Sequence, residues 1–276
     1  MIEPPHIRSV SELLKHCELS PDKNKVDQIY LYLYDLIVTV QLLPLQRISE
    51  IEISDALGAS RTPVREAMIR LSNDGLVKVV PKSGTYVNPI NIDHYLEAAF
   101  MRTLIEVGVA GRAAMKWRDE PQNQRLLTQP LEEQKIALQN EDYFAFAQSD
   151  EAFHFNIFCL ARVPGIWQTV MRGQPDLSRI RHLKRVFKIR RSEEVLSEHQ
   201  TIIAAIRSGS KESAEAAMQA HLGTFETEFP ELSEHPLLVD YIARINEPTP
   251  RNARTFAANA EFAKQQVEGS KLRFKD

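Results

Sequence analysis

Apolar residues in this chain change their spacing twice, near Gly75 and near Asn91. Before Gly75 they recur every three or four positions, as in amphipathic helices. Between the two points, two short runs rich in β-branched residues flank the turn sequence Pro81–Gly84, which predicts a β-hairpin. From Asn91 to about Phe229 the helical spacing returns with only short breaks. The chain is therefore predicted to be mainly α-helical, with one small β element near the end of its first third.

The segment before the hairpin predicts three helices, at about 26–40, 50–57 and 61–74. Gly58 follows the second helix, where a residue in the left-handed conformation commonly ends a helix. Pro63 falls in the first turn of the third helix, where its missing N–H costs least. Three helices followed by a hairpin form one small folding unit.

Length and composition indicate two domains with flanking segments. The 276 residues are about twice the ~150-residue prior for one domain, and 43% hydrophobic with 26% charged residues is ordinary for a globular protein. We expect a poorly ordered arm at 1–24, a first domain at 25–90 and an all-helical domain at 91–231. A polar tail at 232–276 is expected to be dispensable for folding of the two main domains. It contains one apolar segment, 237–245, expected to pack onto the helical domain or extend a dimer contact, and a predicted helix at 255–267.

Charge and cysteine content exclude several classes of protein. The 34 basic and 37 acidic side chains give a net charge of −3, which excludes a uniformly basic nucleic-acid coat but not a local basic patch. Two cysteines are too few for a disulfide framework. The chain start lacks a signal-peptide profile, and no stretch of about 20 apolar residues is free of charge. We expect a soluble, cytoplasmic protein with no membrane partner.

The third predicted helix begins with arginines. Arg61 and Arg65 are four residues apart and share a helix face beside the apolar stripe. The N-terminal end of a helix in the DNA major groove meets bases and phosphates first. Free N–H groups near Ser60 and Thr62 would add phosphate contacts. This pattern predicts a helix-turn-helix that binds DNA.

At the hairpin tip, Lys82 and Gly84 are placed to lie over the DNA backbone or minor groove. An alternative is that the helix face is simply solvated and its arginines pair with Glu66 and Asp74. A helix pair followed by a hairpin is a known DNA-docking arrangement, which favours the first interpretation.

Two runs, Leu57–Ala67 and Asp74–Val77, resemble the winged helix-turn-helix of the GntR family of bacterial transcription regulators. The resemblance implies a homodimer on a palindromic double-stranded DNA operator. It also implies base and phosphate contacts at Arg61, Arg65 and Gly84.

The sequence departs from the family pattern in two places. Leu45 follows Pro44 where the family usually has glycine, and Ser83 stands where a basic residue usually precedes the wing glycine. The second departure reduces the contribution expected from the wing, although Lys82 is close enough to substitute.

The helical half contains one aspartate and three histidines of interest: Asp150, His154, His199 and His221. The first two are four residues apart and project from one face of a helix. One carboxylate and three imidazoles suit zinc, nickel, iron or manganese better than calcium, which prefers oxygen ligands. By spacing alone the signal is weak, because most single histidines in helices are hydrogen-bonded core or surface residues.

The residues around these four positions resemble the FadR-type C-terminal effector domain, FCD, over about 96–228. The resemblance implies an antiparallel bundle of helices that binds one divalent transition metal per chain. It names the same aspartate and three histidines as ligands, with zinc the first expectation and nickel, iron or manganese as alternatives. It further implies that the metal helps to hold a small carboxylate effector.

Arg102 is a candidate effector-binding residue, because an arginine here often faces the effector cavity in the family. The alternative is an exposed ion pair with Glu106, one turn further on, worth a few tenths of a kcal/mol. The sequence leaves both open. Arg181 and Arg185 are weaker candidates for anion binding.

The leading hypothesis is a DNA-binding repressor that senses an organic or sugar acid at a metal site and releases DNA when the acid binds. A second hypothesis is a regulator whose metal is purely structural. A third is a metal-dependent hydrolase or lyase with Glu151 or Glu198 as general base. Each of these glutamates follows or precedes a ligand by one residue and so points about 100° away from it. We therefore assign no catalytic residue and expect no enzyme.

Overall fold

The computed structural model describes residues 7–171, 175–189, 192–223, 230 and 232–248. Its contacts form two compact units. The first contains the described parts of 1–95, 173–184 and 232–276, and the second those of 96–172 and 185–231. The described residues 175–184 thus pack with the N-terminal unit, although the sequence predicts that they belong to the helical domain.

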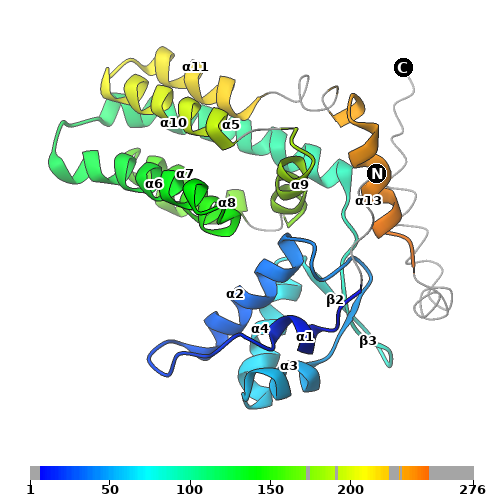
Figure 1. The fold of residues 1–276 in the computed structure, drawn as a ribbon. Helices are drawn as coiled ribbons and strands as arrows, with labels where there is room; N and C mark the ends of the chain where they lie inside the picture. The colour runs from blue at the N-terminus through cyan, green and yellow to red at the C-terminus, as the bar shows by residue number, and fades with distance from the viewer. Residues whose placement is uncertain (1–6, 172–174, 190–191, 224–229, 231, 249–276) are drawn as a thin grey trace. The chain divides into compact units, whose positions relative to one another are not determined.

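The first unit is built around a helix-turn-helix (Figure 1). Its N-terminal helices are α1 (Val10–Leu14), α2 (Lys25–Val38), α3 (Glu50–Leu57) and α4 (Arg61–Asn73). Each contributes fully buried apolar side chains to one core, including Leu14, Leu33, Ile53 and Leu71. The predicted helices at about 26–40, 50–57 and 61–74 are confirmed, except that the first ends at Val38 and Val40 lies outside it with φ +56°.

The N-terminal arm is ordered over the described residues 7–24, and the expectation of poor order is wrong there. Ser9 and Glu12 form a capping box that satisfies the N–H groups at the start of α1. Val10 and Leu14 then lie one turn apart and are buried in the core of the first unit. These two side chains pack the short helix against the core of the first unit.

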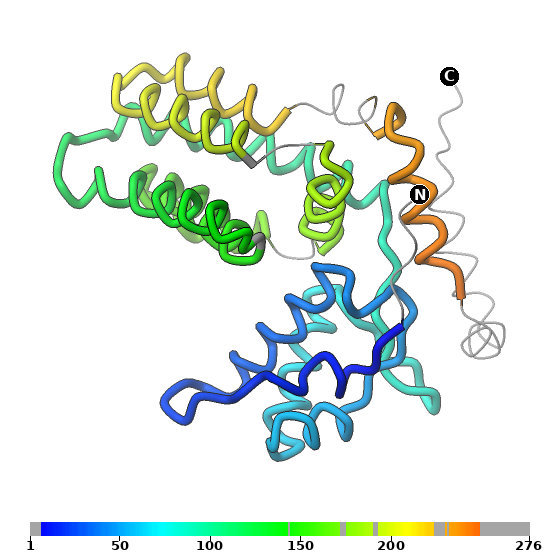
Figure 2. The backbone as a smooth tube through the Cα atoms, viewed as in Figure 1, coloured from blue at the N-terminus to red at the C-terminus, as the bar shows by residue number. Residues whose placement is uncertain are grey.

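The predicted hairpin is confirmed, and Figure 2 shows it as a narrow loop. It consists of β2 (Val77–Val80) and β3 (Gly84–Val87), which pair antiparallel with Val80 opposite Gly84. A third strand, β1 (Arg47–Ile48), pairs with the other edge of β3 and was not predicted. Two residues are too few to show a strand period.

Two later helices belong to the first unit: α9 (Pro175–Val186), apart from its last residues, and α13 (Pro236–Ile245). α13 is strongly amphipathic and buries Leu238, Tyr241 and Ile242. The expectation that the tail is dispensable for folding is therefore not supported for α13. The helix expected at 255–267 lies outside the described residues.

The second unit is all-helical, as expected. Its helices are α5 (Ile92–Lys116, from Leu96 onward), α6 (Pro121–Gln139), α7 (Tyr143–Leu160), α8 (Pro164–Met171), α10 (Ser192–Arg207) and α11 (Lys211–Leu222). α6 lies beside α7, and α10 lies beside α11 (Figure 1). Phe153, Ile202 and Met218, from three of these helices, are fully buried in its core. The mainly α fold class, a winged helix-turn-helix followed by a helical domain, is confirmed.

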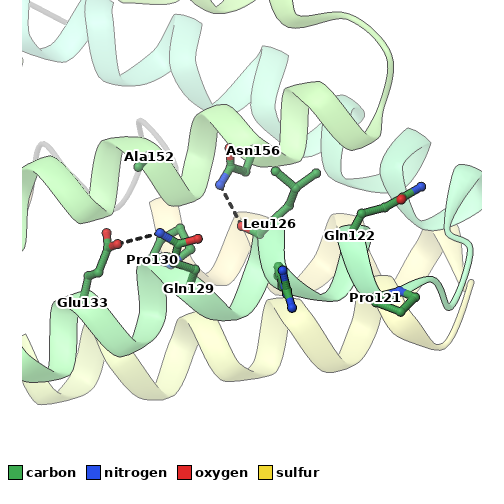
Figure 3. A pocket seen from close by; sticks show the side chains of 9 residues that line it. Pro121, Gln122, Leu126, Gln129, Pro130, Glu133, Ala152 and Asn156 are labelled. Atoms are coloured by element: carbon green, nitrogen blue, oxygen red, sulfur yellow. Dashed lines mark hydrogen bonds between the residues drawn. The ribbon is translucent and has the colours of Figure 1, made fainter.

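Pro130 lies inside α6 and cannot donate a backbone hydrogen bond to Leu126, four residues earlier. The Asn156 side chain on α7 donates to that carbonyl instead, at 2.7 Å (Figure 3). This bond satisfies the carbonyl that the proline leaves without a helical partner and ties α6 to α7.

Candidate functional site

The turn between α3 and α4 has the geometry of a helix-turn-helix. Gly58 ends α3 in the left-handed conformation, with φ +58°. Ser60 is extended and precedes the first turn of α4, and its hydroxyl accepts no hydrogen bond from that turn. The N–H groups at the start of α4 therefore remain accessible to a phosphate.

The predicted DNA-contacting residues of α4 are exposed. Arg61, Thr62 and Arg65 all lie on the open face of the helix. In the described part of the chain, neither Arg61 nor Arg65 forms an ion pair. Two unpaired guanidinium groups on one exposed face suit a polyanionic partner.

Arg70, further along α4, is used differently. It pairs with Asp27 at 2.8 Å and stacks over the Tyr30 ring, with Cζ 4.0 Å from the ring centroid. Asp74 accepts a hydrogen bond from the Tyr30 hydroxyl at 2.8 Å. Asp74, named as a possible partner of the arginines at the start of α4, is thus engaged by α2.

The wing tip is a tight turn. Lys82 is exposed and has φ +62°, and Gly84 has φ +137°, which suits glycine. Ser83 and Tyr86 are joined through their hydroxyl groups at 2.7 Å. A Cβ at Gly84 would lie 2.7 Å from Nε of Arg47 on β1, so Arg47 lies directly against the wing glycine.

Arg47 is a candidate DNA contact that the sequence analysis missed. Its side chain is exposed, and within the described residues it forms no ion pair. It stands on a two-residue strand far from the hairpin in sequence, so only the pairing of β1 with β3 brings it to the wing.

In the second unit, the three predicted histidines converge on one point from α7, α10 and α11. Nε2 of His221 lies 3.2 Å from Nε2 of His154 and 3.3 Å from Nε2 of His199. All three side chains are fully or almost fully buried. Asp150, also buried, lies at the side of this cluster, with Oδ1 3.6 Å from Nε2 of His199. The structure therefore brings all four predicted residues together.

The other ring nitrogen of each histidine faces an oxygen atom. Nδ1 of His199 lies 2.9 Å from Oε1 of Gln134, and Nδ1 of His221 lies 2.7 Å from Oε2 of Glu198. Nδ1 of His154 lies 2.5 Å from Oε2 of Glu106. Because an acceptor fixes the proton on Nδ1, the Nε2 lone pair of each ring points to the common centre.

This donor set fits a divalent transition metal. Two nitrogens that each bind a tetrahedral ion at about 2.0–2.1 Å lie about 3.3 Å apart, close to the observed spacings. Three lone pairs that point at one another repel unless a cation lies between them. Gln134 also donates to Oδ1 of Asp150 at 3.4 Å, which links the carboxylate to the same network. The four side chains would hold the metal, which would supply positive charge; a coordination number above four would leave open positions for an acid.

Arg102 and Glu106 on α5 form an ion pair, but a buried one, with 4% and 1% of the side chains exposed. The ion pair considered from the sequence therefore exists, but it is buried and not exposed as that alternative assumed. Burial opposes ionisation of Glu106, yet Arg102 and His154 outweigh it and hold the pKa of this carboxyl at about 2. Burial lowers the pKa of His154, which favours the neutral ring that a metal needs.

One guanidinium nitrogen of Arg102, Nη2, is buried and has no hydrogen-bond partner among the described residues. A buried N–H group without a partner is costly, so the position is suited to an acceptor that enters from outside the chain.

The structure gives no role as a base to Glu198. Its carboxylate is engaged with Nδ1 of His221, on the side of the ring away from the Nε2 cluster. Glu106, Gln134 and Glu198 were missed as supports for the histidines, because they come from three different helices. Only Glu106 had a signal in sequence, its i,i+4 spacing from Arg102.

A separate hollow of about 630 Å³ opens between α6 and α7 (Figure 3). Polar and charged side chains line it together with apolar neighbours: Gln122, Arg125, Gln129, Glu133 and Asn156. None of the clustered histidines lines this hollow, so it is distinct from the candidate metal centre.

Comparison with protein families gives two matches. Residues 25–87 match the bacterial regulatory proteins of the gntR family, and residues 97–224 match the FCD domain. Among curated proteins, the HTH-type transcriptional repressor RspR of Escherichia coli is 32% identical over 205 residues, 74% of this chain and 89% of RspR. The Uxu operon regulator of Haemophilus influenzae is 28% identical over 221 residues, 72% of this chain and 79% of that protein.

Solved structures share the fold. The Escherichia coli protein McbR/YncC superposes with a TM-score of 0.62 at 18% identity, over 77% of this chain and 99% of that one. A GntR regulator from Rhodococcus gives a TM-score of 0.59 at 21% identity, over 76% and 97%. Among the described residues, no helix combines the length and apolar character that crossing a bilayer requires.

Proposed function

This chain belongs to the GntR family of bacterial transcription regulators and carries an FCD domain; on that premise we propose that it is a homodimeric repressor controlled by a small organic or sugar acid. The acid binds at a metal site in the helical unit and releases the protein from DNA. Its family and its relatives are regulators and not enzymes. A protein that binds the bacterial chromosome acts in the cytoplasm, which is the location we propose for it.

One observation carries the sensing proposal: the convergence of three Nε2 atoms and the Asp150 carboxylate in a buried site. We assign one zinc ion per chain to it, with nickel, iron or manganese as alternatives. Each imidazole is oriented by an oxygen acceptor from the chain, as is usual for metal-ligating histidines. No such arrangement is needed for a core that only packs.

A carboxylate effector suits the charges of this site. The metal attracts an anion. Nη2 of Arg102, which has no hydrogen-bond partner among the described residues, offers a buried donor. Arg102 pairs with Glu106, whose carboxylate lies against Nδ1 of His154. The apolar helices around the site make these attractions stronger than they are in water. The name of RspR, a transcriptional repressor, is consistent with the proposed repression.

DNA binding rests on the exposed basic groups of the first unit. Arg61 and Arg65 enter the major groove, Ser60 and Thr62 bind phosphates near the start of α4, and Lys82 and Gly84 approach the backbone at the wing. Two copies related by a two-fold axis read a palindrome.

The second copy has a candidate surface on α5. Its outer face exposes Leu104 by 63% and Met115 by 53%, near Gly108, where a Cβ would meet nothing within 4 Å. Glu97 lies at one end of this stripe and Lys116 at the other, both exposed. Antiparallel pairing around a two-fold axis brings the acidic end of one helix to the basic end of the other. The charges therefore favour a second copy of this chain as the occupant.

A thermal-shift screen of sugar acids, hydroxy acids and dicarboxylates tests the sensing proposal. It is run on zinc-loaded and on chelator-treated protein. An acid that raises the melting temperature only of the zinc-loaded form, and that weakens operator binding in a gel shift, supports it. Acids that bind equally well to both forms would favour a purely structural metal.

A further inference from the structure

The segment that joins β3 to α5 is held by side chains from distant parts of the first unit. Arg179 on α9 donates from Nη1 to the carbonyl of Asn88 at 2.6 Å and from Nη2 to the carbonyl of Pro89 at 3.0 Å. The guanidinium is 1% exposed and also pairs with Asp176 at 2.6 Å. One buried charged group thus binds two successive linker carbonyls.

The next linker residue is held from another helix. The backbone N–H of Ile90 donates to Oδ1 of Asn246 at 2.9 Å, and the Ile90 carbonyl accepts from Nδ2 of Asn246 at 2.8 Å. Asn246 directly follows α13. Its amide therefore matches both hydrogen-bonding groups of one residue, as a neighbouring strand would.

α9 also contacts the DNA-binding helices themselves. The Tyr34 hydroxyl on α2 donates to Oγ of Ser178 at 3.3 Å. Pro175, at the start of α9, lies so near the turn after α4 that a Cβ on Gly75 would be 3.6 Å from its Cγ. α9 is therefore packed against the helix-turn-helix at the same time as it holds the linker.

Along the chain, α9 ends at Val186 and α10 begins at Ser192. α10 carries His199 of the candidate metal centre and Glu198, which supports His221. The helix that holds the linker is thus the covalent neighbour of the helix that carries the metal site. α9 is therefore the next helix along the chain from the one that carries the candidate ligand His199.

We propose that Arg179 and Asn246 are positioning residues that couple the metal site to DNA binding by holding the linker Asn88–Ile90. This proposal rests on the proposed function. Arg179 binds the linker from the element that leads to the metal site. Asn246 binds it from the end of α13, a helix that is not adjacent in sequence to α10. Movement of α9 relative to α13 therefore changes the conformation of the linker. The wing ends just before the linker, and α5 begins just after it.

Hydrogen–deuterium exchange of the full-length protein tests this, with zinc alone as the probe. Wild type, Arg179→Met and Asn246→Asp are compared with and without zinc. Asn246→Asp keeps the acceptor for the Ile90 N–H and loses the donor to the Ile90 carbonyl. Arg244→Met, an exposed arginine on α13, is the matched control. Zinc content is measured for every protein by mass spectrometry.

In wild type and in Arg244→Met, zinc is expected to slow exchange in the peptide that contains Ile90. It is also expected to change affinity for operator DNA selected from genomic fragments, on the order of 10-fold. In Arg179→Met both responses should be lost while zinc stays stoichiometric, and Asn246→Asp should be intermediate. A residue with only a structural role would lower stability without removing the response to zinc.

The proposal is overturned if the linker of wild type does not respond to bound zinc, or if Arg179→Met responds as wild type does. Should Arg179→Met be unfolded by circular dichroism, Asn246→Asp decides alone, and an unchanged response there rejects the coupling. A wild-type protein that binds no zinc would instead refute the metal site, and the coupling with it. A wild-type protein that shows no sequence-specific DNA binding would contradict the DNA-binding assignment.

Discussion

Glu198 accepts a hydrogen bond from Nδ1 of His221 at 2.7 Å, although its neighbour in sequence is another histidine of the cluster, His199. One turn of α10 therefore supplies both a candidate ligand and the support for a ligand on α11. Consecutive residues point about 100° apart on a helix, so one faces the cluster and the other reaches around the partner ring. This explains why Glu198 is a poor candidate for a general base.

Replacing Glu198 by Ala is expected to weaken zinc binding by about 10–100-fold, because Nδ1 of His221 loses the acceptor that orients its ring. Competition with a chromophoric chelator measures the affinity. Glu194→Ala, an exposed glutamate on the same helix, is the control and should bind zinc as wild type does. Equal affinities in the two variants would exclude a supporting role for Glu198.

Replacing Arg65 by Ala should cost about 1–3 kcal/mol of operator binding if the guanidinium reads a guanine. Fluorescence anisotropy with operator and scrambled DNA separates this from general charge loss. Arg118→Ala, exposed in the second unit, should have little effect. Wild-type affinity should also fall steeply with salt because phosphate contacts release counterions. If footprinting of wild type finds no preferred sequence, the assignment of a specific operator fails.

Gly84→Ala should destabilise the wing. The residue has φ +137°, and a Cβ there would meet Nε of Arg47 at 2.7 Å. A side chain in this backbone region costs on the order of 1–3 kcal/mol, readable as a lower midpoint of urea unfolding. Gly165→Ala, where a Cβ meets nothing within 4 Å, serves as the control and should not lower the midpoint. Equal midpoints for the two variants would show that the turn tolerates a side chain.

Leu104→Glu should convert the proposed dimer to monomers, because it places a charge in the centre of the exposed stripe on α5. Sedimentation velocity measures the change. Ile136→Glu, a similarly exposed apolar residue on α6, should leave the dimer intact. A Leu104→Glu protein that still sediments as a dimer would place the interface elsewhere.

Most helices and the hairpin were predictable from sequence, because the residues that determine them are close together in the chain. The helical period, Gly58 and Pro63 located α3 and α4, and β-branched residues around a turn located the hairpin. The histidines of the candidate metal centre were found by resemblance to a family, since their spacing alone is weak.

Features that depend on pairing between distant segments were not predictable. β1 has two residues and exists only because β3 pairs with it. Arg179 appears in sequence as one of several basic residues on α9, and nothing local indicates that it binds the carbonyls of Asn88 and Pro89. The order of α1 likewise depends on core contacts that its own five residues do not reveal.

Metal content after dialysis, measured by mass spectrometry, tests the candidate metal centre most directly. Wild type should retain stoichiometric divalent metal, most readily zinc, and His199→Ala combined with His221→Ala should retain none. The same double variant should still bind operator DNA, because its winged helix-turn-helix belongs to the other unit. His16→Ala combined with His235→Ala, two histidines outside the cluster, should keep the metal. Stoichiometric metal in the His199/His221 variant would contradict the proposed site.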